Sequence, residues 1–260
     1  MSGSCHSESR LHNLPRVLRL SISLAAFLFL AAAATAQETA TVRVADGFDL
    51  PVGRDGTKQY FKARGFRANG HLGEDWNGVG GGDTDLGDPV YAIAHGLVVF
   101  ARDYRLGWGN VVIVRHAYVE EGATRYVDSL YGHLHEMLVT EGQQLSRGQK
   151  LGTIGNNRGM YDAHLHFELR KNLSVGMHRN SFPRDASVYW DPAEFIPARN
   201  VLPGGERFAL VPINTFAPTP PPVYATQPAP LSPLRRPGTE TSVSPRGPFR
   251  VERYSDLKGQ

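Results

Sequence analysis

The chain has 260 residues with 28 Lys or Arg, 25 Asp or Glu and one cysteine, Cys5, enough for one substantial domain or two small ones. A single cysteine excludes a disulfide framework and a zinc site built from thiolates. Residues 37–211 hold 19 basic and 21 acidic residues, and this near balance argues against a nucleic-acid-binding domain, which concentrates basic residues.

The N-terminal segment has the pattern of an export signal. Three arginines precede an apolar stretch over residues 20–34, and the tripeptide Ala-Thr-Ala at 34–36 is typical of a cleavage site. We therefore predict a secretory signal peptide over residues 1–36 and an exported protein, periplasmic or secreted. The alternative is a retained membrane anchor, but the apolar stretch is short for a span. No other segment approaches transmembrane length, so no stable span is expected after signal removal.

Strand-like runs recur through the middle of the chain, bounded by Gly, Asp and Asn, and no convincing 3.6-residue amphipathic pattern falls between them. They cover residues 90–100, 110–116, 126–134, 150–154 and 163–169. This pattern predicts a mainly β protein, with a small antiparallel β-sheet or sandwich domain.

The last of these runs carries two histidines that flank a leucine. Because side chains alternate along an extended chain, His164 and His166 share one face while Leu165 and Phe167 point into a core. Two imidazoles side by side on a packed strand do little for stability. They are well suited to binding a metal or handling protons.

An upstream motif, His71-Leu72-Gly73-Glu74-Asp75, brings a histidine and a short carboxylate to one locality. Its glycine weakens a helical interpretation, so we place the motif on a loop that runs into a strand, where donors four residues apart lie on the same side. Catalytic zinc takes three protein ligands and leaves one position for water. His71, Asp75 and one histidine of the downstream pair meet that count. The two motifs together therefore predict a zinc site.

Six motifs follow one another in order: HLGED, DPVYAIAHGLVVFA, GNVVIVRH, YGHL, GQQLSRGQKLGTIGN and HLHFEL. This series resembles the lysostaphin/LytM-type zinc metallopeptidases, a family of endopeptidases that cut peptidoglycan. The likeness runs from about residue 70 to residue 169 and continues weakly to the Asp-Pro pair at 191–192. The resemblance implies a small, mostly antiparallel β fold with a zinc cleft on one sheet.

Carried over by position, the resemblance implies that His71, Asp75 and His166 bind one zinc ion per domain. It also implies that His164 and His133, the latter from the YGHL motif, are catalytic histidines. His135 competes for the second of these positions, but the register of YGHL favours the histidine at 133. Family members that lack ligands act as regulators of other wall hydrolases, whereas here all five positions are filled. Which of the two catalytic histidines is the general base is left open.

Two segments are longer than a minimal domain of this family requires. Residues 78–88 form a Gly-rich acidic loop in which Asp83, Asp85 and Asp88 offer the oxygens that calcium favours. The spacing completes no calcium loop, so we prefer a solvated loop. The second segment is 171–189. Both flank the ligand motifs in sequence, so we expect them to form walls of the cleft and to tune substrate choice.

Composition changes at residue 212. Residues 212–260 hold 11 of the 18 prolines and few large aliphatic residues, too few to offset the entropy of ordering. We predict a Pro-rich, disordered tail there, which leaves residues 37–211 as the metallopeptidase domain. The tail has six basic and three acidic residues, which suit weak contact with an anionic wall polymer or membrane surface, or a simple tether.

From these features we expect an exported zinc-dependent metalloendopeptidase that hydrolyses peptide bonds in peptidoglycan cross-links through a zinc-activated water assisted by two histidines. The alternative is a non-catalytic wall-binding or amidase-activating module of the same fold. A biotinyl- or lipoyl-like carrier needs a modifiable lysine at a hairpin tip, whereas Lys150 lies on the strand side. The cleaved bond stays open between D-Ala to diaminopimelate, a glycine bridge and a non-wall peptide.

Overall fold

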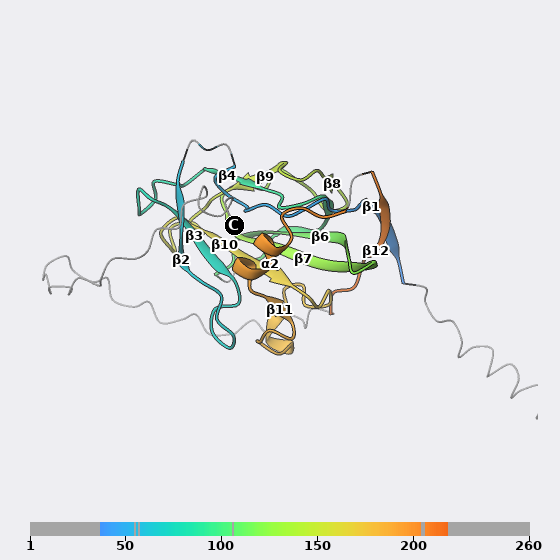
Figure 1. Ribbon diagram of the computed structural model, residues 1–260. Coiled ribbons are helices and arrows are strands. Elements are labelled where there is room, and N and C mark those ends of the chain that lie inside the picture. The colour runs from blue at the N-terminus through green and yellow to red at the C-terminus, as the bar shows by residue number, and fades with distance from the viewer. Residues whose placement is uncertain (1–36, 55, 57, 106, 204–205, 218–260) are drawn as a thin grey trace, which may run out of the picture. The chain divides into compact units, whose positions relative to one another are not determined.

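A computed structural model describes residues 37–54, 56, 58–105, 107–203 and 206–217 (Figure 1). The predicted signal peptide and the tail from residue 218 onward lie outside the described residues, so both stay predictions. No helix in the described part of the chain is both long enough and apolar enough to cross a membrane.

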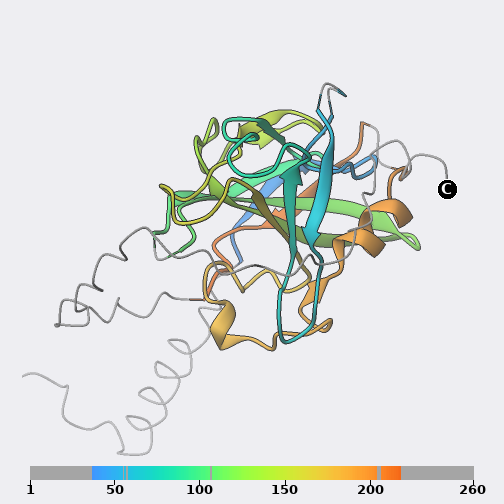
Figure 2. The ribbon, with the colours of Figure 1, turned by 90° about the vertical axis from the view of Figure 1, so that its left-hand side faces the viewer.

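An antiparallel eight-stranded sheet organises the described residues. Seven strands lie in the order β2-β3-β10-β7-β6-β5-β8, and β11 pairs with β10. Their bounds are β2 (Tyr60–Arg64), β3 (Glu74–Gly78), β10 (Leu165–Arg170), β7 (Ala123–Leu134), β6 (Asn110–Glu120), β5 (Gly96–Asp103), β8 (Gln144–Leu145) and β11 (Tyr189–Trp190). Figure 2 shows β2 and β3 side by side, as their antiparallel pairing requires.

Two further two-stranded sheets complete the β structure. One pairs β1 (Thr39–Arg43) with β12 (Phe208–Pro212), and the other pairs β4 (Pro89–Tyr91) with β9 (Lys150–Thr153). The β4–β9 pair packs on the large sheet (Figure 1), where Val90 and Leu151 join Val112, Tyr131 and Phe167 in one buried apolar cluster. The prediction of a mainly β, antiparallel domain is confirmed.

The hairpin between β6 and β7 is longer than the alternation predicted, since the strands continue to Glu120 and begin again at Ala123. Glu121 and Gly122 between them have φ of 52° and 76°. A two-residue turn with both φ values positive is the type I′ turn that suits the twist of antiparallel strands. This hairpin forms the middle of the large sheet.

The predicted strand over residues 90–100 is wrong as a single element, because β4 ends at Tyr91 and β5 begins at Gly96, in another sheet. Between them the backbone bonds to a loop and to a side chain: the Ala92 amide donates to the Gln149 carbonyl at 2.8 Å, and the Ile93 amide donates to the Tyr131 hydroxyl of β7 at 3.1 Å. Apart from His95 and Gly96 the run is apolar, so its hydrophobic pattern does not locate where the strand ends.

A short helix, α2 (Pro192–Ala198), and a 3₁₀ turn, η1 (Arg179–Ser181), were not predicted. Local signals for α2 were present. The Asp191 carboxylate caps the helix by accepting from the Ala193 amide at 2.9 Å, and a proline occupies its first turn. The helix buries Phe195 against the edge of Phe48, with ring centroids 5.0 Å apart.

The boundary predicted at residue 212 is several residues too early. β12 runs through Pro212, and beyond it the Thr215 hydroxyl donates to the Leu173 carbonyl at 2.6 Å. The Phe216 ring lies under the guanidinium of Arg115, 5.5 Å from its centroid. Pairing with β1 and these contacts hold residues that composition alone assigns to the tail.

Buried His116 on β6 makes the stability of the domain dependent on pH. Its Nδ1 donates to the His95 carbonyl at 2.9 Å, which leaves Nε2 to accept from the Ser129 hydroxyl at 2.7 Å. Burial lowers the pKa of His116 to about 4. As pH falls from 6.5 towards 4, the unfolded chain takes up this proton before the folded one, so stability is lost in that window, by up to about 3 kcal/mol.

The free energy of unfolding, measured in urea, should fall between pH 7.5 and pH 4.5. We therefore expect this fall to be smaller in His116→Gln than in the wild type, by about 2 kcal/mol. The exposed His135→Gln should behave as the wild type. Equal pH dependence in all three proteins would contradict this account of His116.

Candidate metal centre

Two neighbouring strands position the predicted ligands. In the antiparallel pairing of β10 with β3, His166 stands directly opposite Asp75, and on the other side of β10 it faces Gly132 of β7. Side chains of directly opposite residues lie close together on one face. Gly132 has no side chain, and a Cβ there would lie 3.3 Å from the Trp108 ring. The glycine therefore leaves room for Trp108 beside His166.

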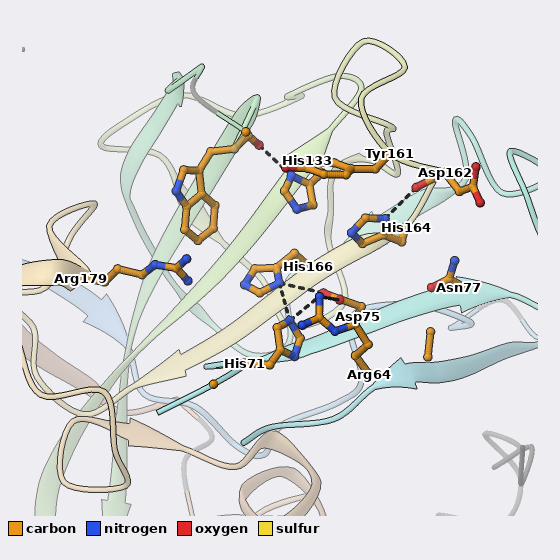
Figure 3. Close-up of a pocket in the computed structure, with 14 residues that line it drawn as sticks. Arg64, His71, Asp75, Asn77, His133, Tyr161, Asp162, His164, His166 and Arg179 are labelled. Carbon is orange, nitrogen blue, oxygen red and sulfur yellow. Dashed lines mark hydrogen bonds and ion pairs between the residues drawn. The ribbon is translucent and has the colours of Figure 1, made fainter. Parts of the chain in front are cut away.

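His71 reaches the same point from the segment before β3. Its Nε2 lies 3.0 Å from Asp75 Oδ1 and 3.2 Å from His166 Nδ1, and the last two atoms are 2.8 Å apart (Figure 3). Among the described residues this is the only group of three or more His, Cys, Asp or Glu side chains placed to share an ion. Ligand atoms of a tetrahedral zinc ion lie about 3.3 Å apart, so the donor spacing suits such an ion.

Outer hydrogen bonds fix which nitrogen each histidine presents. His71 Nδ1 donates to the Gly65 carbonyl at 3.1 Å, so Nε2 faces the cluster unprotonated. His166 Nε2 donates to Glu168 Oε1 at 2.9 Å, so Nδ1 faces the cluster. Arg170 in turn donates from Nε and Nη2 to Glu168 Oε2, at 2.8 and 2.7 Å. Carboxylates and carbonyls behind histidine ligands orient the rings in this way.

The electrostatics of the cluster favour a cation. Burial by itself would raise the pKa of Asp75, but its interactions with His166 and His71 outweigh burial and hold that pKa well below its usual range. Burial by itself would raise the pKa of Glu168 too, and the charge of Arg170 with the hydrogen bond from His166 lowers it to about 2. Two buried carboxylates therefore stay ionised around His166, an arrangement that positive charge stabilises.

His133 lies beside the cluster at the end of β7, in the left-handed region with φ of 62°. Its backbone amide and Nδ1 both donate to the Trp108 carbonyl, at 3.0 and 3.1 Å, which leaves Nε2 unprotonated. Burial, with the neighbouring His166 and His164, lowers the pKa of His133 to about 3. The imidazole is therefore neutral at physiological pH and able to accept a proton or a hydrogen bond.

His164 faces the same cleft as His166, as the alternation predicted, although β10 begins one residue later at Leu165. It is half-buried, and its Nδ1 donates to the Asp162 carbonyl at 2.7 Å. The ring centroids of His164 and His133 are 4.9 Å apart. By contrast His135 is exposed and lies outside the residues that line the cleft.

The cleft has a volume of about 530 Å³ and includes three side chains that sequence reasoning missed: Trp108, Tyr161 and Arg179. Trp108 stacks on His133, with centroids 6.2 Å apart, and turns its edge to His166. It stands between two glycines with positive φ. The pattern GWGN before a strand was the available signal, an aromatic residue held on a tight turn.

The two long segments differ in their relation to the cleft. The segment 171–189 contributes Arg179 to the wall, so its expected place at the cleft is confirmed, while its effect on substrate choice stays a prediction. The loop 78–88 lines no part of it, and the expectation is wrong there. Asp83 in this loop instead accepts a hydrogen bond from the Ala163 amide at 2.8 Å, which holds the backbone just before His164.

The same loop gives no support for a calcium site among the described residues. Its carboxylates have separate partners, since Asp85 accepts from the Gly78 amide at 2.8 Å while Asp88 accepts from the Tyr60 hydroxyl at 2.8 Å and pairs with Lys58. Carboxylates engaged with three different groups do not form one oxygen cage.

Comparison with known proteins places these residues in a family. The model of peptidase family M23 matches residues 73–178. The peptidoglycan DD-endopeptidase ShyA of Vibrio cholerae is 35% identical over 119 residues, which are 45% of this chain and 26% of ShyA. The chain therefore covers only about a quarter of the length of that relative.

Two proteins named NlpD are each 39% identical over 90 residues, 34% of this chain: lipoprotein NlpD of Yersinia enterocolitica, of which 84% is covered, and murein hydrolase activator NlpD of Escherichia coli, of which 22% is covered. Among solved structures, lysostaphin from Staphylococcus simulans is 27% identical with a TM-score of 0.39, covering 62% of this chain and 55% of its own. The identity and coverage with the Yersinia protein, together with the family match over Asp75, His133, His164 and His166, show that this chain belongs to peptidase family M23.

Proposed function

We propose that this chain is an exported zinc metalloendopeptidase that hydrolyses peptide bonds in peptidoglycan cross-links. The observation that carries the proposal is the convergence of His71, Asp75 and His166 at the floor of a cleft that also holds His133 and His164. Two nitrogen donors and one oxygen donor are a ligand set of catalytic zinc, whose fourth position takes water or substrate.

In this proposal the three residues hold one zinc ion. When bound, zinc lowers the pKa of a coordinated water to about 7 and polarises the scissile carbonyl. The Gly65 carbonyl and Glu168 keep the ligand imidazoles in the tautomers that present Nε2 of His71 and Nδ1 of His166. Those fixed orientations mean that little reorganisation is needed when the metal and the substrate bind.

His133 and His164 supply the proton transfers. The unprotonated Nε2 of His133 and the ring of His164 line the same cleft, so an imidazole there can take a proton from the attacking water and, once protonated, give that proton to the leaving amine. The Trp108 and Asp162 carbonyls that accept from their Nδ1 atoms keep both rings aimed at the cleft.

The cell-wall substrate and the envelope location are inferred from two supports. The relatives include a protein named peptidoglycan DD-endopeptidase and proteins named murein hydrolase activator. The pattern of residues 1–36 is that of an export signal. Because ShyA is matched over only 26% of its length, the activity of the whole protein is part of the proposal.

A second candidate function is activation of another wall hydrolase, favoured by the 39% identity to the murein hydrolase activator NlpD. The presence of all five metal-binding and proton-transfer side chains favours catalysis over this candidate. An activator has no need of a metal ligand set with ordered outer hydrogen bonds.

We expect the zinc-loaded protein to release soluble muropeptides from purified peptidoglycan, with products identified by mass spectrometry. His166→Ala should lose activity together with zinc. His133→Ala and His164→Ala should keep zinc but lose activity by about 10²–10⁴-fold, because each removes a proton-transfer group. The exposed His135→Ala serves as the matched control and should cleave as the wild type does.

Two results would count against zinc-dependent catalysis by this chain. One is a zinc-loaded wild type that releases nothing by itself but accelerates an added amidase, which is the behaviour of an activator. The other is full activity after exhaustive chelation, which would remove the metal from the proposal.

We expect Glu168 to raise zinc affinity, because its carboxylate accepts from His166 Nε2 and orients that ring. Glu168→Gln replaces this charged acceptor by a neutral one. Zinc affinity, measured by competition with a chromogenic chelator, should fall by about 10–100-fold. The exposed Glu194→Gln is the control, and circular dichroism checks that each variant folds. Unchanged affinity in folded Glu168→Gln would show that the outer carboxylate does not orient the ligand.

A further inference from the structure

Arg179 is a cation of the cleft wall that the proposed zinc site does not use. It comes from η1, in the segment after the 73–178 family match, and its side chain is 30% exposed. Two contacts hold its guanidinium among the described residues: the plane lies over the Trp108 ring at 4.8 Å, and Nη1 lies 3.4 Å from Glu168 Oε1. An arginine that is stacked in this way is oriented before any ligand arrives.

Glu168 engages only a small part of the Arg179 guanidinium. Arg170 already donates twice to Glu168, at 2.8 and 2.7 Å, and His166 donates to the other oxygen at 2.9 Å. The contact of Arg179 is longer than these, and a distance of 3.4 Å is at the weak end for a hydrogen bond. Most of the fork of N–H donors on Arg179 therefore remains available at the cleft.

The cleft is electrically asymmetric along its length. Figure 3 shows Arg179 on one side of His133 and His166 and Asp162 on the other side, beside His164 and Tyr161. Arg64 also lines the cleft, but it pairs with Asp75 at 3.5 Å. An anionic group on a bound peptide is attracted to the side of Arg179 and repelled from the side of Asp162. The reacting histidines lie between the two, so the anion would sit near the bond that is cut.

We propose that Arg179 binds a free carboxylate on the residue next to the scissile amide and so determines substrate choice. This deepens the proposed function and rests on it. The substrate class is a direct stem-to-stem cross-link, in which the amine donor is a diamino dicarboxylic acid that keeps a free α-carboxylate on the carbon bearing the acylated amine. A glycine bridge offers no such group, because its internal residues are joined through both ends. Bidentate pairing with a carboxylate suits the planar guanidinium.

The test uses two synthetic cross-linked peptides that differ only in the α-carboxylate of the amine donor, free in one and amidated in the other. With the zinc-loaded full chain we expect kcat/KM to be about 10–100-fold higher for the free acid, as a lost charge-assisted pair implies. Arg179→Gln should abolish this preference, mainly through KM, and leave the amidated peptide unaffected. Arg179→Lys should keep part of it, since charge remains but the fork does not.

The matched control is Arg158→Gln, which removes a cation paired with Asp103 at 2.6 Å in the adjoining hollow outside this cleft. It should keep the wild-type preference. Equal losses on both peptides in Arg179→Gln would mean that the residue only supports Trp108 and Glu168, and the proposal would fall. A wild type that does not distinguish the peptides would also overturn it.

If the wild type cleaves neither peptide, the proposed function is refuted. The binding of the two peptides, measured by calorimetry, then tests the carboxylate site at Arg179 by itself. Tighter binding of the free acid by the wild type, by about tenfold, and no such difference in Arg179→Gln would keep the carboxylate site. Equal binding of the two peptides by the wild type would remove it.

Discussion

The site depends on the position of β10 between β3 and β7. This register sets His166 opposite Asp75 on one side and opposite Gly132 on the other, so an imidazole and a carboxylate meet without strain while Trp108 fits above the glycine. A shift of one residue would turn His166 into the core and bring an apolar side chain to the cleft. The apolar residues on the opposite face of β10 therefore hold the proposed metal ligand in place as they pack.

This arrangement buries charged side chains, which costs free energy, and ion pairs between side chains of β10 offset that cost. Glu168 and Arg170 alternate with the apolar residues of β10 and pair with each other, while His166 takes the remaining oxygen. Removing one partner of such a group would leave an uncompensated buried charge. The same network orients the proposed ligand and stabilises the strand, so site and fold share these contacts. His133 has a backbone in the left-handed region, and the two hydrogen bonds that it donates to the Trp108 carbonyl hold it in this strained conformation.

The cleft joins residues inside and outside the range that the family model matches. Asp75, His133, His164 and His166 fall within the range common to the M23 family, whereas Arg179 follows it. The shared part would carry out the hydrolysis, and the additional segment would read the group beside the scissile bond. Trp108 connects the two, since its ring meets His133 and His166 and supports the guanidinium of Arg179.

The sequence by itself determined the β class and the same-face placement of His164 and His166, because a two-residue period is a local property of an extended chain. It also indicated His71 and Asp75 as companions through motif order. Only the tertiary structure decided the break between β4 and β5, the roles of Trp108 and Arg179 in the wall, and the ordered residues beyond Pro212. Each of these depends on contacts between segments far apart in the chain, and such contacts leave no periodic trace in the residues that make them.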